Sequence, residues 1–101
     1  MNLVLLTLVA PRALEEELLE QLLIHPEWAS GFTLSQVEGH SQRGASLSIQ
    51  EQVRGRAGRV ALQIVLEAEQ AERLLGHLKA RFPKPDVAYW LTPVSDFGRL
   101  A

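Results

Sequence analysis

Arginine side chains gather in one polar, glycine-containing segment of this chain. Residues 41–57 hold Arg43, Arg54 and Arg56, and Arg59 lies two residues beyond the segment. These are half of the chain's eight arginines, although the chain has a formal net charge of −2. Loops longer than about 12–15 residues are uncommon in compact domains unless they are functional or disordered. Because guanidinium groups pair well with carboxylates and phosphates, the segment is predicted to contact an anion or a partner protein. An equally weighted alternative is that these arginines only keep the protein soluble.

The histidines are the next residues whose side chains could do chemistry. His25, His40 and His77 lie far apart in the sequence and lack the spacing of metal ligands on one helix. His25 is expected to flank the first helix and His77 to lie at the edge of the second helix's polar face. His40 directly precedes the polar segment and is the candidate for ligand contact. The chain has no cysteine, which excludes disulfides and thiolate sites and fits a cytoplasmic location.

The residues that several classes of function require are absent from the sequence. No phosphate-binding or dinucleotide glycine motif is present. The strand-like run 60–66 is aliphatic, which argues against base stacking as in RNA-recognition domains. Ser46 and Ser48 have no nearby His or Asp partner in the sequence, so nucleophilic catalysis is unsupported. We therefore expect no enzyme activity and no cofactor.

Charge and hydropathy exclude two further kinds of partner. A net acidic chain does not favour nucleic acid or a membrane surface. No apolar run approaches the roughly 20 residues of a membrane-spanning helix. The apolar run Leu3–Ala10 has no basic residue ahead of it, which argues against a signal peptide.

The first strand indicates self-association. Residues 2–9 are apolar on both alternating faces, with Thr7 as the only polar member after Asn2. A strand that is apolar on both sides is covered on both sides. In so small a domain the helices cover one face, and the simplest cover for the other is another copy of the chain.

The remaining periodicities predict a single α+β domain over residues 1–101. The order is β-α-β-β-α-β, typical of a ferredoxin-like sandwich whose antiparallel four-stranded sheet carries two helices on one face. Pro11 is expected to be the first helical residue. Ser95–Ala101 is predicted to be a polar tail that is disordered unless it docks. The expected elements are strand 2–9, helix 11–25, strand 31–40, strand 59–67, helix 69–82 and strand 87–92.

Residues 31–44, with Gly31, Thr33, Val37, Gly39 and the step Gln42-Arg43-Gly44, resemble the second strand and loop entry of the P-II signalling family. This family belongs to the nitrogen regulatory P-II/CutA superfamily. The element order extends the resemblance across most of the chain. The Tyr89-Trp90 strand ending at Pro93-Val94 is similar to a small uncharacterised branch found beside heavy-metal efflux genes.

The resemblance implies a homotrimeric regulator whose sheets face a central axis. Such proteins bind small effectors in clefts between subunits and dock a long loop, the T-loop, onto a target such as a transporter or an enzyme. The loop base is then expected to bind ligand, and the arginines beyond it to contact the partner. These residues are Gly39, His40, Gln42 and Arg43 for the ligand, and Arg54, Arg56 and Arg59 for the partner.

The chain departs from the family at the place where ATP phosphates bind. Residues 82–86 (Phe-Pro-Lys-Pro-Asp) have no glycine, and two prolines offer no backbone N–H groups. Residues 41–57 also contain no tyrosine for nucleotidylylation. Two alternatives stay open: a CutA-like divalent-metal protein using His40 and an acid of a neighbouring subunit, and an ACT-like module that binds an amino acid.

Overall fold

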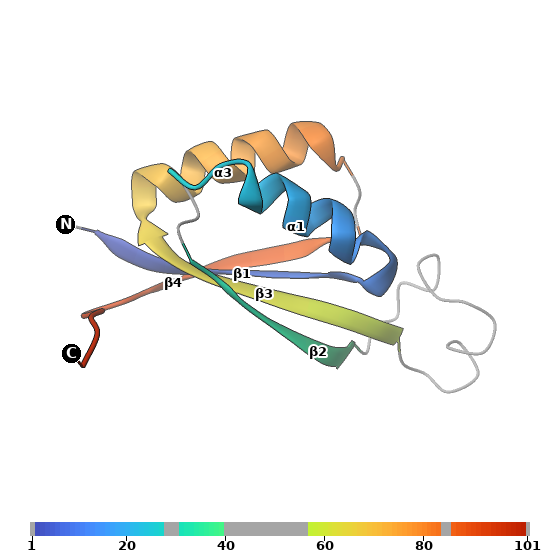
Figure 1. Ribbon diagram of the computed structural model, residues 1–101, viewed down its shortest axis with the longest axis horizontal. Helices are drawn as coiled ribbons and strands as arrows, with labels where there is room; N and C mark the ends of the chain where they lie inside the picture. Colours follow the sequence, from blue (N-terminus) through green and yellow to red (C-terminus); the bar gives the residue numbers. More distant parts are fainter. Residues whose placement is uncertain (1, 28–30, 40–56, 84–85, 101) are drawn as a thin grey trace.

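A computed structural model describes residues 2–27, 31–39, 57–83 and 86–100. Four strands form one antiparallel sheet in the order β2-β3-β1-β4. Both helices lie on the same face of this sheet (Figure 1). The predicted ferredoxin-like α+β fold is confirmed. The elements are β1 (Leu3–Pro11), the 3₁₀ turn η1 (Arg12–Leu14), α1 (Glu15–Leu23), β2 (Thr33–Gly39), β3 (Ala57–Glu67), α3 (Ala68–Arg81) and β4 (Ala88–Pro93).

The core lies between the helices and the two central strands. β1 and β3 pair along their whole common length, from Leu3 opposite Glu67 to Pro11 opposite Arg59. Because strand side chains alternate between faces, this register places one apolar set of each strand under the helices. The buried members are Leu6, Leu8 and Ala10 from β1 and Val60, Leu62, Ile64 and Leu66 from β3.

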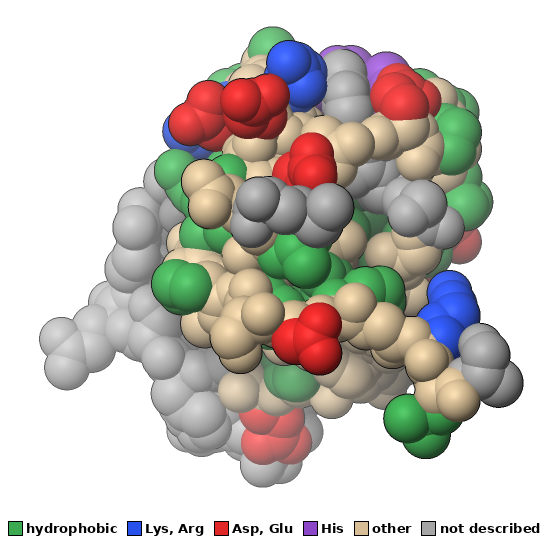
Figure 2. Space-filling view, turned by 90° about the vertical axis from the view of Figure 1, so that its left-hand side faces the viewer, with side chains coloured by type: hydrophobic (Ala, Val, Ile, Leu, Met, Phe, Trp, Pro, Cys, Tyr) green, Lys and Arg blue, Asp and Glu red, His purple; other side chains and the backbone are tan. Residues whose placement is uncertain are grey.

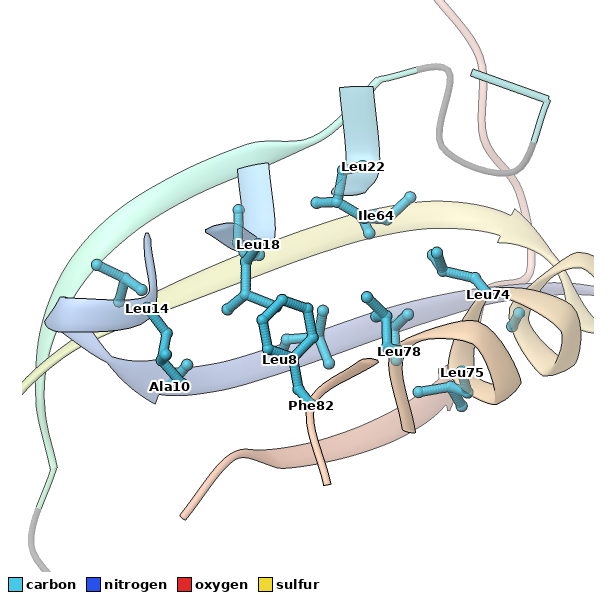
Figure 3. Close-up of a cluster of buried hydrophobic side chains, with 14 of the residues drawn as sticks. Leu8, Ala10, Leu14, Leu18, Leu22, Ile64, Leu74, Leu75, Leu78 and Phe82 are labelled. Atoms are coloured by element: carbon cyan, nitrogen blue, oxygen red, sulfur yellow. The ribbon is translucent and has the colours of Figure 1, made fainter. Parts of the chain in front are cut away.

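The helices contribute leucine stripes at helical spacing. Leu14, Leu18 and Leu22 recur every four residues, and all three are buried. In α3 the buried set is Ala71, Leu74, Leu75 and Leu78, with Phe82 just after the helix. Figure 3 shows Leu18 and Leu22 of α1 and Leu74 and Leu78 of α3 directed toward β1 and β3. Fully burying one such leucine stabilises the fold by about 1.5–3 kcal/mol, so packing of these stripes holds the two layers together.

Pro11 differs from its predicted place. It is the last residue of β1 and has φ −56° and ψ 143°, so it is extended and not helical. Its lack of an N–H is tolerated there because β4 pairs with β1 only as far as Val9, leaving one side of Pro11 unpaired. The α-helix therefore begins only at Glu15, after one 3₁₀ turn.

The sheet face away from the helices, termed the open face, is partly apolar. Leu5, Val9 and Val65 are half-buried there, and Trp90 is 50% exposed. Thr7 is only 3% exposed, yet its Oγ1 has no hydrogen-bond partner within the described part of the protomer. Both faces of β1 carry apolar side chains, and the helices cover only one of them. Among the helices of the described ranges, none has the length and apolarity to cross a bilayer.

Candidate functional site

The predicted ligand residues lie where the sheet ends and the long loop begins. Gly39 is the last residue of β2 and lies opposite Ala57, the first residue of β3. The β2–β3 pair therefore holds the two ends of the loop side by side. The other predicted loop residues, His40, Gln42, Arg43, Arg54 and Arg56, lie outside the described residues.

Arg59 lies inside the fold. It is a β3 residue that is 8% exposed, and its Nη1 donates a hydrogen bond of 2.9 Å to the backbone oxygen of Asp86. This contact ties the start of β3 to the segment between α3 and β4. The guanidinium is thus directed to its own chain, a role that the sequence did not indicate because the two residues are 27 positions apart.

A second arginine lies at the same end of the sheet. A Cβ atom built on Gly58 would be 3.5 Å from Cζ and Nη2 of Arg12, so the Arg12 guanidinium lies against this backbone. Glu38 is opposite Gly58 in the strand register. The described base of the loop therefore brings Arg12 and Arg59 to one end of the sheet, together with the acidic residues Glu38 and Asp86.

The open face contains a cavity of about 410 Å³, termed the effector pocket after the role proposed for it under Proposed function. Its walls come from three strands and from the C-terminal tail. A hydrogen bond of 3.0 Å from the N–H of Val94 to the oxygen of Leu3 holds the start of the tail to β1. The lining residues are Leu5, Gly31, Phe32, Thr33, Gln63, Val65, Phe97 and Arg99.

The tail runs beside the open face and remains exposed, with Phe97 58% accessible to solvent. Phe97 and Arg99 lie beside the sheet face that the helices leave open. Figure 2 looks at the end of the molecule where both termini lie, and hydrophobic side chains gather at the centre of this view. The apolar Phe97 within a tail predicted to be polar is the signal that could have indicated its place in the lining of the cavity.

The effector pocket combines apolar walls with a few polar groups. Leu5, Phe32, Val65 and Phe97 offer apolar surface, whereas Thr33, Gln63 and Arg99 offer a hydroxyl, an amide and a guanidinium. Small-molecule sites commonly show this mixture, in which the polar groups orient the ligand. The chemistry fits a ligand with an apolar or planar body and an anionic group.

The fold brings together two of the three histidines. The ring centroids of His25 and His77 are 4.4 Å apart in an edge-to-face arrangement. His77 Nε2 is 2.7 Å from Oε1 of Gln21, and His25 Nδ1 is 3.2 Å from Oε1 of Glu27. A backbone hydrogen bond, and then the bond to His25, lower the pKa of Glu27. Within the described ranges, no group of three or more His, Cys, Asp or Glu residues is arranged to hold a metal ion.

Comparison with protein families gives a match over the whole chain. A family model described as "Protein of unknown function (DUF3240)" matches residues 1–101. A crystal structure of a DUF3240 family protein from Shewanella baltica OS155 has a TM-score of 0.79 and 25% identity. It covers 100% of this chain and 99% of that chain. No curated protein matches the chain significantly by sequence.

Two further solved structures connect the fold to P-II-like proteins. A putative PII-like signaling protein from Thermus thermophilus is 28% identical, with a TM-score of 0.64 over 93% of this chain and 88% of that chain. The second is CPII, a nitrogen regulatory PII-like protein from Thiomonas intermedia K12 bound to ADP, AMP and bicarbonate. It has a TM-score of 0.73 at 15% identity, and the match covers 100% of this chain and 98% of that chain. Structures of CutA proteins share the fold as well. The predicted relationship to the P-II/CutA superfamily is confirmed.

Proposed function

The chain belongs to the DUF3240 family, and from this premise we propose that it is a non-enzymatic, P-II-like regulatory protein of the cytoplasm. In this proposal it assembles as a homotrimer and binds a small effector in clefts between subunits. It contacts a partner protein, such as a transporter or an enzyme, through the loop of residues 41–57. The observation that carries the proposal is the effector pocket on the open face.

The pocket's position supports an effector site between subunits. Leu5, Gln63 and Val65 belong to the sheet face that the helices leave open, whereas Phe97 and Arg99 belong to the tail. A second copy packed on the open face would close this cavity from outside. Effector binding and assembly would then depend on the same surface.

Two features of the open face support self-association. Half-buried Leu5, Val9 and Val65 provide apolar area, and half-exposed Trp90 provides an aromatic anchor.

The loop lies at the other end of β2 from the effector pocket, because Thr33 begins this strand and Gly39 ends it. In the proposal, Gly39, His40, Gln42 and Arg43 of a neighbouring subunit therefore contact the effector, and Arg54 and Arg56 contact an acidic surface of the partner. Arg59, which the sequence grouped with these two, instead holds the loop's exit against Asp86. Effector binding would shift the loop between conformations by favouring the state that completes the site.

A thermal-shift experiment tests the effector pocket. The probes are AMP, ADP, bicarbonate and 2-oxoglutarate, the first three because they are bound in the Thiomonas CPII structure. A ligand at a hundred times its Kd adds about 2.7 kcal/mol to stability, enough to raise Tm by roughly 10 °C in a domain of this size. We expect at least one anionic probe to do so, and Arg99→Gln to remove more than half of the increase.

Arg73→Gln is the matched control, because Arg73 lies on the outer side of α3 and is 4.0 Å from Glu69. This variant should keep the full shift. A wild-type protein that no probe stabilises, or an Arg99→Gln variant that responds like the wild type, would contradict the proposal. No observation among the described residues favours the CutA-like or the ACT-like alternative over it.

A further inference from the structure

A second cavity, termed the helix-side cavity, lies on the other face of the sheet from the effector pocket. Its volume is about 390 Å³, within the range of small-molecule sites. It opens between α1, the end of α3 and the start of β4. Its walls are Leu18, Leu78, Phe82, Pro83, Val87 and Tyr89, and Lys79 completes the lining.

The inner wall of this cavity is part of the core. Leu18, Leu78 and Phe82 are 1%, 5% and 7% exposed, so packing fixes their positions. Figure 3 shows these three side chains converging beside Leu8. Their side chains carry no hydrogen-bonding groups, and Pro83 has no backbone N–H. The inner wall therefore accepts an apolar body and has little to offer a polar one.

The rim has the opposite chemistry. Lys79 is exposed at the end of α3, and its Nζ is 5.0 Å from the centroid of the Tyr89 ring. This cation–π contact holds the ammonium group over the cavity's aromatic wall. An ammonium group has three N–H donors, so Nζ can still donate to an anion while it lies over the ring.

We propose that the helix-side cavity binds a small amphiphilic anion, with its apolar body against Leu18, Leu78 and Phe82 and its carboxylate at Lys79. Charge complementarity selects this occupant over a neutral or cationic one of the same length. The site is separate from the effector pocket, with which it shares no lining residue.

The cavity also touches the segment that holds the loop's exit. Phe82, Pro83 and Val87 flank Asp86, whose backbone oxygen accepts the hydrogen bond from Arg59. An occupant that packs on this segment therefore stabilises the position to which β3 is tied. Occupancy of the cavity is expected to reduce hydrogen exchange at Val87.

Titration with three probes of equal chain length tests the ligand class. We expect octanoate to bind saturably, with NMR shifts centred on Leu18, Val87 and Tyr89 and not on Thr33 or Gln63. Octylammonium should bind at least about tenfold more weakly, and octanol should fall between them. Lys79→Gln should weaken octanoate binding about fivefold, the value of one exposed ion pair, and leave octanol unchanged.

Two further variants complete the test. Val87→Phe fills the mouth and should abolish binding of all three probes, with circular dichroism confirming its fold. Arg73→Gln, on the same helix, should bind octanoate like the wild type. The proposal is overturned if octanoate does not bind, or binds no better than octylammonium. It is equally overturned if the shifts lie at the effector pocket, or if Val87→Phe binds like the wild type.

Discussion

His25 and Glu27 show how single polar residues join the two helices of this fold. The rings of His25 and His77 meet edge to face, and His77 is hydrogen-bonded to Gln21 of α1. Glu27, just beyond α1, is 3.2 Å from His25 through Oε1. These contacts lie outside the leucine core, and they fix the end of α1 relative to α3.

The first prediction concerns the pKa of Glu27, which lies below its ordinary value of 4.5 mainly because of a backbone hydrogen bond and secondly because of His25. A carboxyl whose pKa is lowered by folding stabilises the fold above its ordinary pKa, and this contribution is lost as the pH falls through the lowered value. His25→Ala should raise the pKa of Glu27 part of the way toward 4.5. An NMR titration of the carboxyl carbon measures it.

His77→Ala serves as the control, because it keeps the contact between His25 and Glu27. It should leave the pKa of Glu27 nearly unchanged. An identical pKa in the wild type and in His25→Ala would show that the backbone bond alone sets it.

At the level of elements, Gln70 links the start of α3 to the turn after α1. Its Oε1 accepts a 3.2 Å hydrogen bond from the N–H of Glu67, which precedes the helix. Its Nε2 donates a 3.1 Å bond to the backbone oxygen of Glu27. The side chain thus satisfies one donor at the start of α3 and one acceptor in the neighbouring turn.

A second prediction therefore separates the two bonds of Gln70. Gln70→Ala removes both and should lower the free energy of unfolding by about 1–2 kcal/mol. Gln70→Glu keeps the acceptor for Glu67 but loses the donor to Glu27, so it should cost less. Urea unfolding at a fixed protein concentration measures both.

Glu72→Ala, at an exposed position of α3, is the control and should stay within about 0.5 kcal/mol of the wild type. If Gln70→Ala is as stable as this control, the linking role of Gln70 is wrong.

At the scale of the whole molecule, the helices cover one face of the sheet and leave the other face open. The helices bury Leu6, Leu8 and Ala10 almost completely, whereas Leu5 and Val9 of the same strand stay half-buried. Apolar area on a central strand that the chain's own helices cannot reach favours association with another copy.

The third prediction follows from this asymmetry. Leu5→Lys places a charge at the centre of the proposed interface, where it would lose its hydration, and should convert the assembly to monomers. Leu23→Lys makes the same substitution at a position of α1 that is 67% exposed and should keep the wild-type mass. Light scattering at micromolar concentration measures the mass. A wild-type monomer, or a Leu5→Lys variant of wild-type mass, would contradict the proposed assembly.

Local periodicity determined which segments form strands and helices and which side chains enter the core. The alternation of Val60, Leu62 and Ile64 and the four-residue spacing of Leu14, Leu18 and Leu22 require no knowledge of distant residues, because burial follows the period of each element. Pro11 was misplaced because its fixed φ suits both a helix start and an extended strand end. Its strand position depends on where β4 stops pairing.

Only the tertiary structure decided which distant residues meet. The Arg59–Asp86 bond, the His25–His77 pair and the cavity that Phe97 and Arg99 line with the sheet all join segments that no local pattern relates. They depend on the register between β1 and its two neighbours, where a shift of one residue would move every side chain to the other face. The sequence thus determined the helices and strands and the apolar side chains on both faces of β1, and the sheet register decided where the pockets lie.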